Sequence, residues 1–198
     1  EVGAARSSWL PYFAREYGFT VSGIDYSELG CAQARAILEQ AGVDGQILCA
    51  DFFAPPGELI GQFDALLSFG VIEHFADTAD CVEAFARFLR PGGVMISIVP
   101  NLLGIGGFLQ KRVCRNIYDV HNVLDRRSLR AAHQRAGLDV KASRYFIGGG
   151  FVTVNFCCRQ DSRFYWAISR ASTALSMPFL LLDRIKASAR PNRLTSPY

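Results

Sequence analysis

The sequence predicts an α/β fold built on a mostly parallel sheet. Over the first two-thirds of the chain, short apolar runs typical of strands alternate with segments of helical periodicity, as in βαβ units. Three carboxylates follow the same repeat: Glu1 opens one apolar run, and Asp25 and Asp51 each end another. In an open parallel sheet, acids at the carboxyl ends of neighbouring strands face one crevice, where ligands bind. The spacing therefore predicts the fold class and the edge of the sheet that carries the function.

Composition narrows the classes of partner. The chain has 198 residues, of which half are apolar and a fifth are charged, and this is enough for one domain with its own core. The formal charge of +3 gives no reason to expect a nucleic-acid partner. The six cysteines include no CxxC pair and have no histidine at metal-ligand spacing. We therefore expect reduced thiols, a cytoplasmic location and no metal.

The N-terminal elements follow from periodicity and capping residues. A helix is predicted over 7–17, where Gly18 ends it. A strand over 19–25 comes next, followed by a helix from its N-cap Ser27 to Ala41. A third strand leads to Asp51.

The middle of the chain continues the alternation. Residues 63–69 and 94–99 predict buried strands, and the helix between them is expected over about 77–90. Pro91-Gly92-Gly93 breaks that helix. The segment 100–124 is loop-rich and longer than an ordinary connection, which favours a functional lid.

The C-terminal third begins with a helix that Asp125 caps and that reaches Ala136. Strand-like runs follow over 140–147 and 151–156. The tail 164–182 is apolar, with one charge in 19 residues, which is near the length of a membrane span. Its proline and four Ser or Thr residues make a spanning helix unexpected. We expect a helical hairpin lying on the domain, and weak peripheral membrane contact is the alternative.

The loop after the first strand, Gly3-Ala4-Ala5-Arg6-Ser7, consists mainly of small residues that let a ligand approach the backbone. A dinucleotide-binding loop has three glycines, G-x-G-x-x-G, and this loop has one, which argues against NAD or FAD. Asp25 could accept hydrogen bonds from ribose hydroxyls, or could only complement the dipole of the next helix. Asp51 and Phe52 offer an acceptor and an aromatic face for adenine, although Phe52 could equally belong to the core.

A Glu-His pair follows the fourth strand, in Ser68-Phe69-Gly70-Val71-Ile72-Glu73-His74-Phe75. His74 is a candidate general base, because the pKa of histidine normally lies near working pH. The alternative is a histidine that serves only the local structure. A metal site at Glu73 and His74 lacks further ligands in the sequence nearby.

Taken in order, these segments resemble the class I S-adenosylmethionine-dependent methyltransferases, in particular the methyltransferase type 11 group of ubiquinone/menaquinone-type methylases. The resemblance covers about residues 1–100 and rests on Glu1-Val2-Gly3, Gly23-Ile24-Asp25-Tyr26-Ser27, Cys49-Ala50-Asp51-Phe52, Phe63-Asp64, Ser68 to His74 and Leu89-Arg90-Pro91-Gly92-Gly93. It implies a Rossmann-like three-layer sandwich whose seven-stranded, mostly parallel sheet ends in an antiparallel strand. It also implies S-adenosyl-L-methionine as the cofactor.

The resemblance assigns ten residues to the cofactor. Those near its methionine and sulfonium part are Glu1, which would hold the amino group, Gly3, Ala5, Ser68, Phe69 and Gly70. Those near its ribose and adenine are Asp25, Tyr26, Asp51 and Phe52. The family's glycine-rich loop, E/D-x-G-x-G-x-G, departs here in having Ala5 and Ser7 at its later glycine positions.

The expected domain organisation is a methyltransferase domain over 1–160, with the lid at 101–124, and a helical apolar segment over 161–198 that packs on it. The chain opens inside an apparent strand and without Met, so we expect further residues before Glu1. The ending 194–198 resembles the approach to the family's last strand, which predicts truncation there too.

The predicted function is methyl transfer to a small molecule through an oxygen, nitrogen or carbon nucleophile. His74 or Glu73 is the expected base, and His121 is a weaker candidate. The residues expected to line the substrate are Tyr118, His121, Tyr145 and Phe146. The alternatives are an NAD(P)-dependent oxidoreductase on a similar sheet and a non-catalytic, cofactor-binding or membrane-associated scaffold.

Overall fold

The computed structural model describes residues 1–146, 163–184, 194 and 196–198. They divide into two compact units. The first unit contains Glu1–Ile72 and Ala79–Ile98, and the second contains Glu73–Thr78 and Val99–Tyr198. Each unit is described by itself below.

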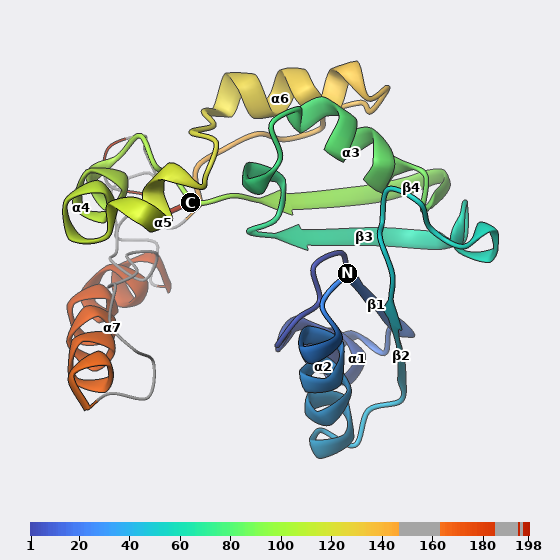
Figure 1. The fold of residues 1–198 in the computed structure, drawn as a ribbon, viewed down its shortest axis with the longest axis horizontal. Helices are drawn as coiled ribbons and strands as arrows, with labels where there is room; N and C mark the ends of the chain where they lie inside the picture. Colours follow the sequence, from blue (N-terminus) through green and yellow to red (C-terminus); the bar gives the residue numbers. More distant parts are fainter. Residues whose placement is uncertain (147–162, 185–193, 195) are drawn as a thin grey trace. The chain divides into compact units, whose positions relative to one another are not determined.

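The first unit is built on parallel strands (Figure 1). β1 (Val21–Asp25) pairs with β2 (Gly45–Cys49), and β3 (Phe63–Phe69) pairs with β4 (Leu89–Ile98). Val2 joins the two pairs, because it forms parallel bridges to both Ile24 and Ser68. The order across the sheet is therefore β2–β1–Val2–β3–β4, which confirms the predicted parallel sheet. Of the seven strands that the resemblance implied, the described residues show these four and the bridging Val2.

Two helices lie beside β1 and β2, namely α1 (Trp9–Tyr17) and α2 (Glu28–Gln40) (Figure 1). Their ends follow the predicted capping residues. Gly18 ends α1 in the left-handed conformation, with φ +67°, and the Ser27 side chain accepts a hydrogen bond from Gly30 N at 3.1 Å. The apolar side chains that the helices bury against the strands form one core, made of Ala4, Leu10, Val21, Cys31, Ala34, Leu38 and Ile47. Removing these side chains from water is what holds the helices to the strands.

The segment between β3 and β4 differs from the prediction in its boundaries. α3 (Thr78–Ala86) ends four residues before the expected Arg90, and β4 begins at Leu89 instead of Val94. Leu89 pairs with Phe63 and Val94 pairs with Ala65, so the Pro-Gly-Gly residues bulge out of a continuous strand. The prediction that Pro91-Gly92-Gly93 breaks the helix was therefore wrong: the helix ends at Ala86, and these residues lie within β4 because of strand pairing that the local sequence does not show.

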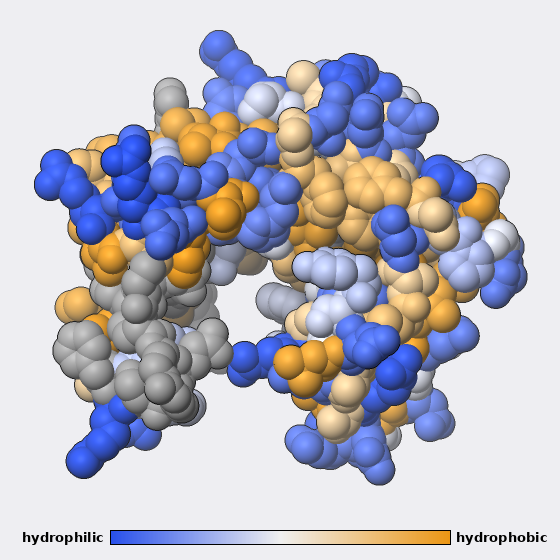
Figure 2. Space-filling model, viewed as in Figure 1, coloured by the Kyte–Doolittle hydropathy of each residue, from blue (hydrophilic) through white to orange (hydrophobic). Residues whose placement is uncertain are grey.

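The second unit contains four α-helices in its described part: α4 (Ile105–Val113), α5 (Arg115–Asp119), α6 (Arg126–Arg135) and α7 (Arg163–Arg184). The 100–124 segment, predicted to be loop-rich, therefore contains two short helices. Apolar and charged side chains mix on their surface (Figure 2), and the Arg112 guanidinium lies 5.0 Å from the centre of the exposed Phe108 ring. Asp125 caps α6 as predicted, in a capping box with Ser128.

Two further expectations about the second unit and the thiols are corrected here. Residues 140–146, predicted to form a strand, have no regular secondary structure, and the strand expected over 151–156 lies outside the described residues. Cys114 is disulfide-bonded, in contrast to the expected reduced thiols, while Cys31, Cys49 and Cys81 are free. Among the described helices, α7 included, none is long and apolar enough to cross a membrane.

Candidate functional site

The predicted cofactor residues gather at the carboxyl edge of the first unit's sheet. The bridges from Val2 to Ile24 and Ser68 place the residues that follow these three positions next to one another. Gly3 N donates to Ile24 O at 2.9 Å, so the loop after Val2 starts beside Asp25. Val2 is also where the sheet order reverses. From Val2 the chain adds β1 and then β2 on one side, and it then returns to add β3 and β4 on the other side. Parallel sheets bind ligands at this switch point.

Asp25 is the centre of this edge. It is buried, and its two carboxylate oxygens accept hydrogen bonds from Ala5 N at 3.0 Å and from Ser27 N at 2.9 Å. The carboxylate thus ties the Gly3–Ser7 loop to the start of α2. Each carboxylate oxygen has a second lone pair, so the side chain keeps acceptor capacity for ribose hydroxyls.

Gly3 and Gly70 give the backbone its turns at this edge. Gly3 has φ +73°, and a Cβ atom there would lie 2.4 Å from Val71 Cγ2. Gly70 has φ +68° and donates from its N–H to Ile98 O at 2.9 Å. Only glycine accommodates both the conformation and the close contact at Gly3.

Ser68 and Phe69 end β3 at the same edge. Ser68 is 1% exposed, and its hydroxyl has no hydrogen-bond partner among the residues that the structure describes. A buried hydroxyl without a partner costs free energy unless a bound group satisfies it. Phe69 stacks on Trp9 with ring centres 5.0 Å apart, a contact that sequence reasoning missed because the two residues are far apart in the chain.

The residues predicted near adenine differ in exposure. Phe52 is 6% exposed and packs edge-on against Phe85, with ring centres 4.9 Å apart, so it lies in the core as the alternative reading held. The neighbouring Phe53, which the sequence did not single out, is 40% exposed. Asp51 accepts a hydrogen bond from Phe53 N at 2.9 Å, and Tyr26 is 79% exposed.

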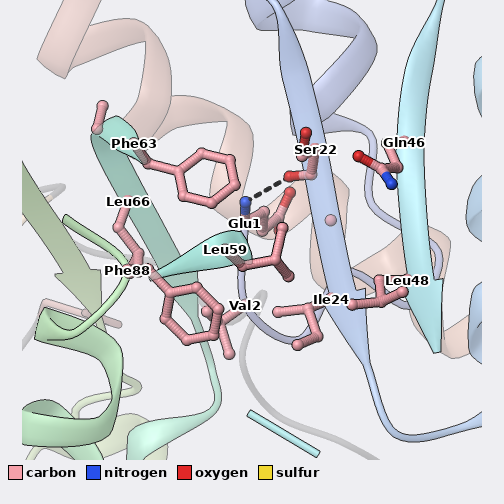
Figure 3. Close-up of a pocket in the computed structure, with 12 residues that line it drawn as sticks. Glu1, Val2, Ser22, Ile24, Gln46, Leu48, Leu59, Phe63, Leu66 and Phe88 are labelled. Carbon is pink, nitrogen blue, oxygen red and sulfur yellow. Dashed lines mark hydrogen bonds between the residues drawn. The ribbon is translucent and has the colours of Figure 1, made fainter. Parts of the chain in front are cut away.

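Glu1 lines a small apolar pocket (Figure 3). Its carboxylate accepts a hydrogen bond from the Ser7 hydroxyl, and burial raises the pKa of the Glu1 side chain. The pocket is lined by Glu1, Val2, Ser22, Gly23, Ile24, Gln46, Leu48, Leu59, Phe63, Ala65, Leu66 and Phe88. Of the ten residues assigned to the cofactor, only Glu1 lines it, so this pocket is separate from the edge around Asp25.

The predicted base lies in the second unit, in the turn 72–74. Glu73 is 2% exposed, and burial raises its pKa to about 7. Burial, and then the neighbouring His121, lower the pKa of His74, so its imidazole is neutral near pH 7. The rings of His74 and His121 have their centres 4.4 Å apart. The structure thus brings His121, which the sequence places in a distant segment, beside the Glu73-His74 pair.

The other residues predicted to line the substrate have mixed surroundings within the second unit. The Tyr118 ring lies 5.2 Å from Lys111 Nζ. Phe146 is exposed, and its backbone hydrogen-bonds with Tyr198 O at 3.0 Å and with the Ser196 hydroxyl at 2.6 Å. Tyr145 is half-buried. Their role at a substrate stays a prediction.

A parallel sheet with a buried acid after β1 and a small-residue loop at the switch point defines a Rossmann-like nucleoside-binding domain. Known proteins identify it further. Residues 1–97 match a family model described as a methyltransferase domain. The ubiquinone biosynthesis O-methyltransferase of Thiobacillus denitrificans is 31% identical over 134 residues, which cover 63% of this chain and 57% of that protein.

Solved structures agree on the fold. A protein assigned as a sarcosine dimethylglycine methyltransferase from Galdieria sulphuraria superposes with a TM-score of 0.63 at 17% identity, covering 91% of this chain and 72% of the other. The [4+2]-cyclase SpnF superposes with a TM-score of 0.56 at 18% identity, covering 69% and 48%. Residues 1–97 therefore belong to the class I S-adenosylmethionine-dependent methyltransferases, and S-adenosylmethionine is the cofactor that this family implies. The chain spans little more than half the length of the Thiobacillus relative.

Proposed function

We propose that this protein transfers the methyl group of S-adenosylmethionine to an oxygen of a small-molecule acceptor. The observation that carries the proposal is Asp25, buried at the switch point and bonded to the backbone of the loop that follows Val2. The choice of an oxygen acceptor is supported by the relative named a ubiquinone biosynthesis O-methyltransferase. We infer that the acceptor group is a hydroxyl of a small molecule, as the name of that O-methyltransferase indicates for the relative.

The residues at the sheet edge fit the polar groups of this cofactor. Asp25 would accept hydrogen bonds from the ribose hydroxyls, and the Ser68 hydroxyl, which has no partner among the described residues, would bond a polar group of the methionine part. Tyr26 and Phe53 offer exposed aromatic surface for the adenine. When bound, the cofactor supplies an activated methyl group on a sulfonium ion. The protein then contributes orientation and exclusion of water, which can lower the barrier by several kcal/mol.

An oxygen nucleophile must lose a proton during the transfer, and the second unit offers a base. His74 is neutral near pH 7, because its pKa is lowered by burial and by His121. A neutral imidazole can accept the proton of a hydroxyl. Glu73 is the second candidate base. Both assignments are predictions, as are the substrate contacts of Tyr118, His121, Tyr145 and Phe146.

The decisive experiment measures the binding of S-adenosylhomocysteine by calorimetry, using full-length protein. We expect Asp25→Ala to raise the dissociation constant about 10- to 100-fold, the loss expected for hydrogen bonds to a charged group. Asp64→Ala is the matched control, because Asp64 is an exposed acid of the same unit that pairs with Arg90 on the surface. Equal affinity of the Asp25 variant and the wild type would contradict the proposed site. Circular dichroism establishes that both variants are folded.

Experiments on the same protein preparation distinguish methyl transfer from two other functions. Affinity for NADH without affinity for S-adenosylhomocysteine would support the oxidoreductase. The cyclase SpnF shares the fold, so cofactor binding alone does not establish methyl transfer. Transfer of labelled methyl from the cofactor into a hydroxylated acceptor would exclude a non-catalytic scaffold.

The domain organisation also remains a proposal: a methyltransferase domain over 1–160, with a lid at 101–124, and an apolar segment over 161–198. The helix α7 occupies most of that last segment, and exposed apolar side chains on it include Trp166, Leu175 and Leu181. They support the alternative of peripheral membrane contact in a cytoplasmic protein.

A further inference from the structure

We propose that Glu73, His74 and His121 form a binding site for a divalent transition-metal ion of the zinc class. The inference goes beyond methyl transfer and does not depend on it, because it concerns the binding of the ion alone. An ion bound here would occupy the lone pairs of His74 and Glu73, so either side chain serves as the base only in the metal-free site. All three residues belong to the second unit. One potential ligand atom from each lies within 4.8 Å of the others.

Backbone hydrogen bonds hold the two chain segments of this site together. Asn122 N donates to Glu73 O at 2.6 Å, and the Asn122 side-chain amide donates to Phe75 O. His121 directly precedes Asn122, so the histidine is anchored beside the turn that carries Glu73 and His74. These hydrogen bonds fix the two backbone segments beside each other, and this brings the three side chains together.

The His121 imidazole is oriented as metal-bound histidines are. His121 Nδ1 contacts Ile117 O, and because a carbonyl oxygen only accepts, Nδ1 carries the proton and Nε2 keeps its lone pair. A metal-binding histidine usually donates its second N–H to a carbonyl or carboxylate in this way.

Glu73 supplies an independent observation. Its side chain is almost completely buried, and within the described part of the chain Oε2 has no hydrogen-bond partner. A buried carboxylate oxygen without a donor is costly unless it is protonated or meets a cation. A metal ion at this position would satisfy Oε2 and take its negative charge.

The ligand set selects the kind of ion. Two imidazoles and one carboxylate match three-ligand zinc sites, which keep a fourth position for water or another oxygen. Magnesium and calcium prefer oxygen ligands throughout, so they fit less well. Tetrahedral bonds of about 2.0 Å place ligand atoms roughly 3.3 Å apart, and separations of up to 4.8 Å would therefore contract on binding. His74 is the exposed member of the three, so water can reach this side of the site.

The test is a titration of tag-free full-length protein, first treated with a chelator, with Co²⁺ followed by its visible absorption and with Zn²⁺ in competition with a chromophoric chelator. We expect one equivalent to bind and His121→Ala to weaken binding at least 10-fold. Glu73→Gln should weaken it by a similar factor, since the amide is a poor ligand. His133→Ala is the matched control, because His133 is the third histidine of this chain and lies in α6.

Wild-type protein that binds no ion, or a His121 variant that binds as the wild type does, would overturn the proposal. A buried, protonated Glu73 with no metal would then explain the unpartnered oxygen. Circular dichroism and the affinity for S-adenosylhomocysteine, measured on the same variants, distinguish loss of the metal ligand from loss of the fold. Because that affinity is measured separately, failure of the metal site and failure of the proposed methyl transfer give different results.

Discussion

Gly3 occupies a position where the backbone conformation and the surrounding space leave no room for any other side chain. It combines φ +73° with a space that Val71 Cγ2 already fills, 2.4 Å from where a Cβ would lie. We predict that Gly3→Ala lowers the free energy of unfolding by about 2 kcal/mol, from left-handed strain and overpacking together. Urea denaturation of full-length protein measures the change.

Val71→Ala provides the control for Gly3, because it removes the methyl group that an alanine would meet. The double variant should regain part of the stability that Gly3→Ala loses, and the double-mutant cycle should give a favourable coupling energy. Additive losses would show that the close contact has no energetic consequence. The backbone strain would still remain in the double variant, so full recovery is not expected.

Within the site, the sequence predicted residues whose chemistry depends on near neighbours. Asp25 was predicted from the strand before it and the capping residue after it, and it lies where expected. The burial of Phe52 against Phe85 and the approach of His121 to His74 depend on contacts between distant segments. No local pattern carries that information, so the sequence left the role of Phe52 open and considered the two histidines separately.

Among the helices, α6 depends most visibly on one cap. The Asp125 carboxylate accepts hydrogen bonds from Arg127 N at 2.9 Å and from Ser128 N at 2.7 Å. We predict that Asp125→Ala lowers stability by about 1 kcal/mol, since it leaves two N–H groups of the first turn without that acceptor. Asp119→Ala should cost less than about 0.5 kcal/mol, because Asp119 forms only an exposed pair with Arg115.

Thermal unfolding of the two variants checks the prediction for α6, and hydrogen exchange of amides 127–129 locates the effect. Equal losses for Asp125→Ala and Asp119→Ala would contradict a specific capping role. Faster exchange should be confined to α6, because a cap acts on the first turn of its own helix.

Element boundaries were predictable where a capping residue sets them, as at Gly18, Ser27 and Asp125. They were not predictable where pairing sets them. The pairing of Leu89 with Phe63 draws β4 past the Pro-Gly-Gly bulge, although those residues normally interrupt a strand. In the 100–124 segment, glycines at 104, 106 and 107 concealed the helix α4.

At the scale of the whole molecule, cofactor binding should stabilise one unit selectively. All ten residues assigned to the cofactor lie in the first unit. At 100 times its dissociation constant, S-adenosylhomocysteine should add about 2.7 kcal/mol to the free energy of unfolding of that unit. Hydrogen-exchange mass spectrometry should show protection in Glu1–Ser7, in β1 and at the end of β3.

The second unit is the internal control for this exchange experiment. Peptides from α4, α5 and α6 should exchange at the same rate with and without S-adenosylhomocysteine. Protection of those helices alone would place the cofactor elsewhere and contradict the assignment to the sheet edge around Asp25.

The central place of Val2 has a consequence for biosynthesis. Val2 precedes both of its neighbours in the sheet, Ile24 and Ser68, along the chain, so it leaves the ribosome before either of them. The strand β3 must be synthesised before the middle of the sheet can close, and until then the Val2 segment lacks its partner on the side that later faces β3. Contacts of such long sequence separation slow folding. The nascent chain therefore passes through a stage in which α1, α2, β1 and β2 exist without the sheet's central contact, and that stage is the one most exposed to aggregation.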